Sequence, residues 1–148
     1  MQELVETLDA WRAEGAGVGR AVVIRTFGSA PRPEGAVLLV TDDGRLAGSV
    51  SGGCVEGAAA EEIWKARKDG NQRVIRYGIS DEDAWDVGLA CGGTIDVLIS
   101  PSVPASAEEA ARETRAGRGG GRAIVTRLPA DAPPPAFGQH APGAGEPP

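Results

Sequence analysis

The chain has two cysteines, and each of them adjoins a pair of glycines. Cys54 follows Gly52 and Gly53 in GSVSGGCVEG, and Cys91 precedes Gly92 and Gly93 in LACGGT. A glycine turn that opens a helix leaves backbone N–H groups that attract anions, and a helix start favours the thiolate form of a cysteine in its first turn. If the two turns face each other, their thiols and N–H donors suit a ligand that carries phosphate together with sulfur or a soft metal.

Plainer interpretations of these two turns stay open. A cysteine inside a cell often serves as a small buried hydrophobic residue, and a Cys54–Cys91 disulfide is a further alternative. The turn before Cys54 matches neither GxGxxG nor GxxxxGK[ST]. A zinc site needs about four ligands, which two cysteines and one histidine cannot supply. That histidine, His140, lies in a segment of Pro, Ala and Gly, so the sequence offers no good histidine base.

Two further segments carry charged residues of interest. Arg32 lies between two prolines in GSAPRPEG, where a stiffened loop would hold its guanidinium as a phosphate clamp. An ordinary surface arginine is an equal alternative. Asp81 to Asp83 follow Ser80, and this order predicts a helix cap with acidic residues in the first turn rather than carboxylate catalysis.

Composition limits the classes of function. The chain has 148 residues, 41% of them hydrophobic and 24% charged, which suits one globular domain. Its formal net charge of −6 argues against a nucleic-acid binder. The acidic amino terminus does not resemble a signal peptide, and no apolar run approaches the ~20 residues of a membrane span. We therefore expect a cytoplasmic protein with free thiols and no membrane contact.

Hydrophobic periodicity and turn residues predict the elements that must position these residues. We expect helices at residues 3–13, 54–68 and 105–116, and a short one after Ser80 that carries Trp85. Strands are predicted at residues 20–27, 36–41, 45–50, 73–78, 94–100 and 121–128, with a hairpin at Asp43-Gly44. A left-handed cap at Gly70 or Asn71 should end the second helix. The fold class is α/β, a mixed sheet of five or six strands flanked by helices, followed by a disordered tail at residues 129–148.

Several of these motifs occur in the order found in a known family. GSAPRPEG, GSVSGGCVEG and YGISDEDAWDVGLACGG together closely resemble the amino-terminal domain of the XdhC/CoxI family. The resemblance is strongest over residues 4–100 and predicts one family domain at residues 1–128. Many family members continue into a carboxy-terminal Rossmann-like domain, which we expect to be absent here.

The resemblance implies a maturation factor rather than an enzyme. Such proteins bind molybdenum cofactor, protect it during sulfuration, and pass it to the apoenzyme of a xanthine dehydrogenase or carbon monoxide dehydrogenase type hydroxylase. Other candidate partners are a cysteine desulfurase, a separate protein with the Rossmann-like domain, and a second copy of the chain. The implied cofactor-binding residues are Cys54, Cys91, Gly52, Gly53, Gly92 and Gly93, with Ser51, Glu56 and Arg32 in second rank.

Two other functions compete with this one. A thiol-dependent redox or sulfur-transfer enzyme would use Cys54 with Cys91, and its thiols would titrate below the ordinary value of about 8.5. An interaction domain or truncated remnant would merely pack its cysteines, and replacing them by alanine would then leave the client enzyme fully active.

Overall fold

The computed structural model describes residues 1–30, 32–78, 93–115 and 127–130. A short 3₁₀ helix, η1 (Gln2–Leu4), leads into helix α1 (Val5–Ala13). The remaining elements follow in the order β1 (Val18–Phe27), β2 (Val37–Thr41), β3 (Leu46–Gly48), α2 (Glu56–Asp69), β4 (Arg73–Gly78), β5 (Thr94–Ser100) and α3 (Ala105–Arg115). The prediction of an α/β fold, with about five strands flanked by helices, is confirmed.

The described strands form one sheet in the order β3-β2-β1-β5-β4. The predicted hairpin at Asp43-Gly44 is confirmed, because β2 pairs with β3 through Val40 and Leu46. All four pairings among the described strands are antiparallel, whereas a mixed sheet was predicted from the helical connections. Helix α2 connects β3 to β4, and these two strands run in the same direction. They are the two edge strands of the sheet, however, and β2, β1 and β5 lie between them.

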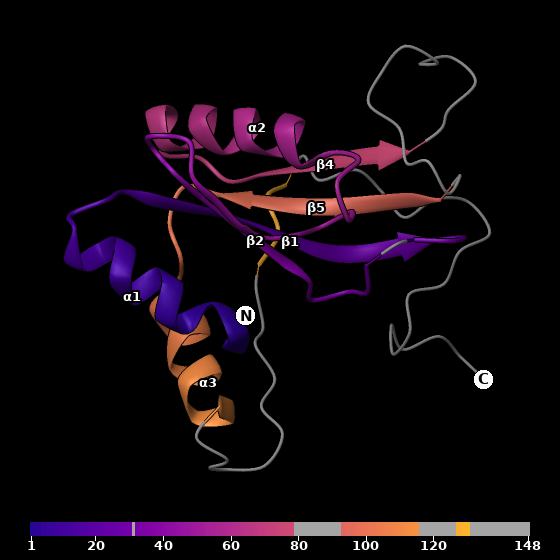
Figure 1. Ribbon diagram of the computed structural model, residues 1–148. Helices are drawn as coiled ribbons and strands as arrows, with labels where there is room; N and C mark the ends of the chain where they lie inside the picture. The colour runs from indigo at the N-terminus through magenta and orange to yellow at the C-terminus, as the bar shows by residue number, and fades with distance from the viewer. Residues whose placement is uncertain (31, 79–92, 116–126, 131–148) are drawn as a thin grey trace.

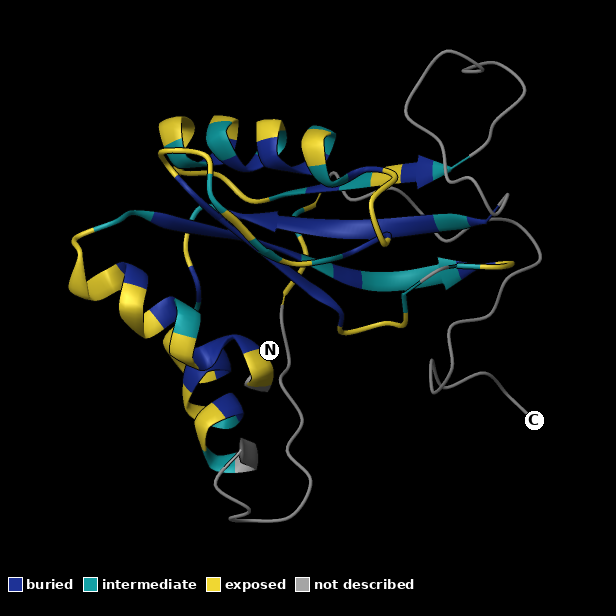
Figure 2. Ribbon diagram, viewed as in Figure 1, coloured by how far each residue is buried: buried dark blue, intermediate teal, exposed yellow. Residues whose placement is uncertain are grey.

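Helices cover both faces of the sheet (Figure 1). Helix α2 lies on one face, where its Ala59, Ile63 and Ala66 pack with alternate residues of the central strands. Helices α1 and α3 lie together on the opposite face, where Leu8 and Trp11 pack against Leu39. Figure 2 shows the resulting pattern, with the central strands buried and the outward sides of the helices exposed.

Specific polar contacts fix α2 against the sheet. Arg67 donates to the carbonyl oxygens of Val18, at 3.3 Å, and Pro101, at 2.6 Å, and it also pairs with Asp42. Trp64 donates its indole N–H to the Thr41 carbonyl at 3.0 Å. The predicted left-handed cap is confirmed at Gly70, which has φ of 76°. These contacts fix the carboxy-terminal half of α2 on the sheet.

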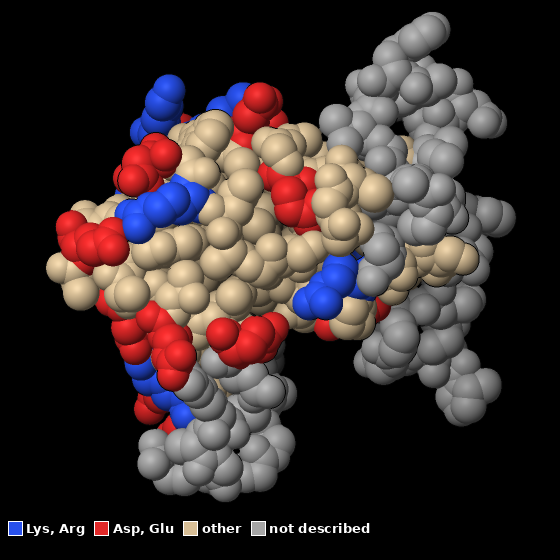
Figure 3. All heavy atoms as spheres, viewed as in Figure 1, with Lys and Arg blue, Asp and Glu red and all other residues tan. Residues whose placement is uncertain are grey.

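Ion pairs join α1 to α3 on the other face. Arg112 contacts Asp9 at 2.6 and 2.8 Å, and Arg12 pairs with the buried Glu108. Acidic and basic side chains lie beside one another over this end of the domain (Figure 3).

Some predictions fall wholly or partly outside the described residues. These are the helix after Ser80, the tail at residues 131–148, and most of the strand at residues 121–128. Arg127 and Leu128, at the end of that predicted strand, are exposed and lie in no strand. Among the described residues, no helix is long and apolar enough to cross a membrane.

Candidate functional site

The loop between β3 and α2, which we call the Ser49–Glu56 loop, contains the first glycine–cysteine turn. It begins after Gly48, whose φ is 81° and whose position leaves no room for a Cβ atom against the Val37 carbonyl. Gly52 and Gly53 have φ of 75° and 122°, backbone conformations that other residues rarely adopt. The three glycines therefore determine the course of this loop, and Cys54 is exposed at its end.

The carboxylate of Glu56 holds the loop together from within. Its Oε2 accepts hydrogen bonds from the backbone N–H groups of Val50 and Ser51 and from the Ser49 hydroxyl, each at 2.8 Å. Its Oε1 accepts from the Ser51 hydroxyl at 2.5 Å and from the Gly53 N–H at 2.8 Å. Five donors thus converge on one carboxylate at the first residue of α2.

The serine hydroxyls extend this network. The Ser49 hydroxyl accepts from the Gly52 N–H at 2.7 Å, and the Ser51 hydroxyl accepts from the Val55 N–H at 2.9 Å. Ser51 is buried, with 2% of its surface exposed. Most of the backbone donors of the loop are therefore engaged inside the chain.

The electrostatics of Glu56 follow from these contacts. Partial burial by itself would raise the pKa of Glu56. The hydrogen bonds from the hydroxyls of Ser51 and Ser49, and from the amides of Ser51 and Val50, outweigh burial and lower the pKa to about 2. Glu56 is therefore ionised at neutral pH and acts as an internal anion at the start of α2.

This arrangement differs in two ways from the prediction for the turn. Helix α2 begins at Glu56 rather than at Cys54, so Cys54 precedes the helix instead of lying in its first turn. The amides of Val50, Ser51 and Gly53, which the sequence offers to an external anion, bind Glu56 instead. The sequence did contain a signal for this internal binding of the amides. An acidic residue three positions after Gly53 is typical of a helix-capping pattern.

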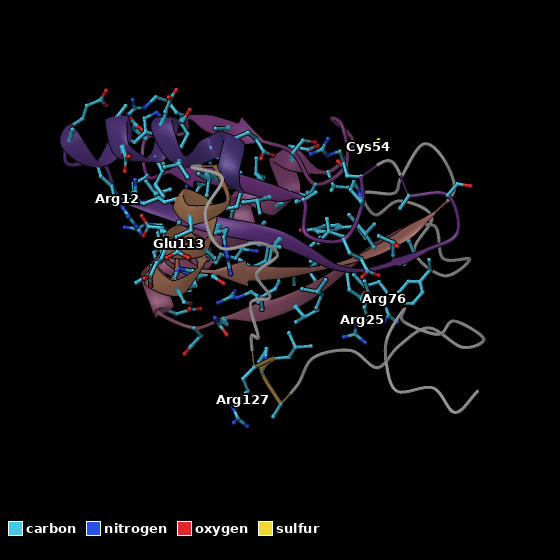
Figure 4. The ribbon with its side chains drawn as sticks, turned by 90° about the horizontal axis from the view of Figure 1, so that it is seen from below. Arg12, Arg25, Cys54, Arg76, Glu113 and Arg127 are labelled. Carbon is cyan, nitrogen blue, oxygen red and sulfur yellow. The ribbon has the colours of Figure 1, made fainter. Side chains whose placement is uncertain are left out.

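The outer side of the turn is open. A Cβ atom built on Gly52 or Gly53 would meet nothing within 4 Å. The side chain of Cys54 is exposed beside them, and Figure 4 shows it at the end of the domain opposite Arg12 and Glu113. A ligand can therefore reach both the backbone of the two glycines and the thiol.

The second glycine–cysteine turn is described only from Gly93. A Cβ atom on Gly93 would lie 2.6 Å from the Ser29 carbonyl oxygen, so the start of β5 packs tightly against the loop that follows β1. Cys91 and Gly92 lie outside the described residues, and so does the predicted approach of Cys91 to Cys54. The structure does show that Gly93 packs against the GSAPRPEG loop.

Arg32, in that same loop, is half-buried. Its Nε atom is buried and has no hydrogen-bond partner among the described residues. The ion pairs found among the described residues do not include Arg32. A guanidinium with donor capacity to spare fits the phosphate-clamp interpretation of this residue.

Sequence reasoning missed one charged cluster. Asp96 is fully buried in β5 between Arg25 of β1, at 3.2 Å, and Arg76 of β4, at 2.7 and 2.9 Å. Figure 4 shows the two arginines beside each other. The available signal was a single aspartate inside the apolar strand TIDVLIS, which requires a partner when buried. Its contacts hold three strands in register near the GSAPRPEG loop.

The chain resembles proteins connected with molybdenum enzymes. The XdhC and CoxI family matches residues 11–78. A molybdenum cofactor insertion chaperone of Escherichia coli is 43% identical over 86 residues, which are 57% of this chain and 26% of that protein. A probable xanthine dehydrogenase subunit of Bacillus subtilis is 35% identical over 79 residues, which are 52% of this chain and 24% of that protein.

A solved structure supports the same relationship. The crystal structure of a xanthine dehydrogenase from Bacillus halodurans matches with a TM-score of 0.59 and 30% identity, over 76% of this chain and 34% of that one. The matched part therefore spans about a quarter of the curated relatives and a third of the solved chain. The resemblance predicted from the motifs is confirmed: residues 11–78 match the XdhC and CoxI family.

Proposed function

We propose that this protein binds molybdenum cofactor and assists its sulfuration and its insertion into a xanthine dehydrogenase or carbon monoxide dehydrogenase type hydroxylase. A relative named as a molybdenum cofactor insertion chaperone supports the role in insertion. The exposed Cys54 on a loop that Glu56 holds in shape is the observation that carries the proposal. The family domain is proposed to occupy residues 1–128, with residues 129–148 as a tail.

The proposed site combines soft and anion-binding groups. The thiol of Cys54 is a soft ligand suited to a molybdenum or sulfur centre, and Cys91 is proposed to supply a second thiol. Gly52 and Gly53 leave room for a bulky pterin to approach the backbone. Gly92 and Gly93 are proposed to shape the same cradle from the second turn.

The phosphate of the cofactor needs donors other than the inner loop amides. Arg32 is proposed to supply them, because its Nε has no partner within the described chain. Ser51 and Glu56 then act as positioning residues that hold the shape of the turn. When bound, the cofactor would supply the molybdenum centre that the client hydroxylase uses, while this chain would only hold and transfer it.

The partners proposed for this function are the apoenzyme of the hydroxylase and a cysteine desulfurase that provides sulfur. A separate protein with a Rossmann-like domain, or a second copy of the chain, is a further candidate. We propose a cytoplasmic location, in agreement with the reducing conditions that free thiols require.

Equilibrium binding of purified molybdenum cofactor to the chain tests the proposal. We expect the wild type to bind and the Cys54→Ala and Cys91→Ala variants to bind at least tenfold more weakly. Glu61→Gln, an exposed change on α2, is the matched control and should bind like the wild type. Absence of binding by the wild type, or equal binding by all variants, would contradict a cofactor site at these turns.

A further inference from the structure

Arg20 is a buried arginine on the face of the sheet opposite α2. It lies in β1, where its Cα partners are Leu39 on β2 and Ser100 on β5. Leu39 packs with Leu8 and Trp11 of α1, and directly paired residues of neighbouring antiparallel strands share a face. The side chains of Arg20 and Ser100 therefore lie on the α1 face, and only 5% and 1% of their surfaces are exposed.

Both side chains have a buried donor without a partner in the described part of the chain. The Nε of Arg20 and the Oγ of Ser100 are buried and make no hydrogen bond with the described residues. Arg20 also takes part in none of the ion pairs found among the described residues. Burial lowers the pKa of Arg20, and no neighbouring charge is found to oppose that effect.

Arg25, a partly buried arginine of the same strand, shows the contrast. Arg25 has 12% of its side chain exposed and contacts the buried carboxylate of Asp96 at 3.2 Å. The nearly buried carboxylate of α3, Glu108, is already engaged by Arg12 and Arg112. Among the described residues no anion pairs with Arg20, and a buried positive charge in that state costs free energy until a counter-ion is supplied.

We propose that Arg20 and Ser100 form an oxyanion-binding site on the α1 face of the sheet. The guanidinium would bind two oxygens of a carboxylate or phosphate group through its planar fork, and the Ser100 hydroxyl would donate to one of them. The site is distinct from the proposed cofactor site, because Val50 and Val55 of the Ser49–Glu56 loop pack into the core on the α2 face of the sheet.

The test uses the whole chain, with inorganic phosphate and acetate as the two probes. Each anion is added at constant ionic strength against chloride, while the Arg20 Nε–Hε resonance is followed by NMR and the melting temperature is measured. We expect at least one probe to shift this resonance with saturation and to raise the melting temperature. Saturation by phosphate alone identifies a phosphate group as the ligand chemistry, and saturation by acetate identifies a carboxylate.

Variants make the test specific. Arg20→Met should bind the active probe at least tenfold more weakly, and without any probe it should melt no lower than the wild type, because it removes an unpaired buried charge. Arg45→Met changes a partly exposed arginine that pairs with Glu14 and Asp43, and it should keep the probe response. Ser100→Ala removes only the hydroxyl group and should weaken binding of the probe severalfold. This variant replaces Arg20→Met in the test if Arg20→Met does not fold.

Two results would overturn the proposal. One is a wild-type Arg20 resonance that neither phosphate nor acetate shifts. The other is an Arg20→Met or Ser100→Ala variant with the same probe affinity as the wild type, because the anion would then bind elsewhere on the chain.

Discussion

Replacing Glu56 by Gln should destabilise the protein in a way that depends on pH. The substitution keeps the size of the side chain but removes its charge and turns one acceptor oxygen into a donor amide. Five hydrogen bonds reach the carboxylate in the wild type, three at Oε2 and two at Oε1. In the variant, the new NH₂ group would face donors on one of these two sides.

The magnitude follows from the pKa and from the lost acceptor. A free glutamate titrates at about 4.3, so a pKa of about 2 corresponds to about 3 kcal/mol between the folded and unfolded chain. Glu56 is only half-buried, and solvent screening reduces this to about 1–2 kcal/mol. A backbone donor left without an acceptor adds about 1 kcal/mol. We therefore expect Glu56→Gln to lower the free energy of unfolding by about 2–3 kcal/mol at pH 7.

The pH dependence has a definite sign. Because the folded pKa is below the unfolded one, the charge contributes its full stability above about pH 5 and loses it as the pH falls toward about 2. The wild type should lose stability over this range more steeply than the variant does. The difference between them should therefore shrink between pH 5 and pH 3.

Urea unfolding followed by tryptophan fluorescence at pH 7, 5, 4 and 3 measures both quantities. Glu61→Gln, on the exposed side of α2, is the control and should change stability by less than about 0.5 kcal/mol at every pH. A loss below about 0.5 kcal/mol for Glu56→Gln at pH 7, or a loss that stays constant down to pH 3, would refute the account of the loop.

Three further substitutions test the fold around the site, each by urea unfolding. Asp96→Asn should lower the free energy of unfolding by about 3–5 kcal/mol, because two arginines lose a buried charged partner, and a loss under about 1 kcal/mol would contradict this. Gly93→Ala should lower the free energy of unfolding by about 1–3 kcal/mol, because its Cβ would meet the Ser29 carbonyl oxygen at 2.6 Å. Gly57→Ala, in open space on α2, is the control and should leave the free energy of unfolding unchanged or raise it. Equal effects of the two substitutions on the free energy of unfolding would contradict the close approach of Gly93 to the Ser29 carbonyl. Trp64→Phe should cost about 1 kcal/mol through the lost hydrogen bond to the Thr41 carbonyl, and no change would show that this bond adds nothing.

Local patterns predicted most elements of the described fold. The strands at residues 73–78 and 94–100 have the predicted bounds, and the Asp43-Gly44 hairpin and the Gly70 cap occur where turn chemistry placed them. These features depend on residues close together in the chain, so alternation and glycine positions suffice to find them. The glycine-rich turn before α2 was visible for the same reason, although α2 begins two residues later than predicted.

The sequence by itself thus determined the family motifs, the local elements, and the place of Cys54 on a turn. Tertiary structure alone decided that β1 pairs with β5 in the antiparallel direction, because these two neighbouring strands come from distant parts of the chain. It decided also that Glu56 fills the turn from within, since five donors meet its carboxylate only at the φ values of Gly52 and Gly53. It decided also that Asp96 pairs with two arginines, while Arg20 pairs with no anion among the described residues. Charge pairing depends on distances across the sheet, which the spacing of residues along the chain does not give.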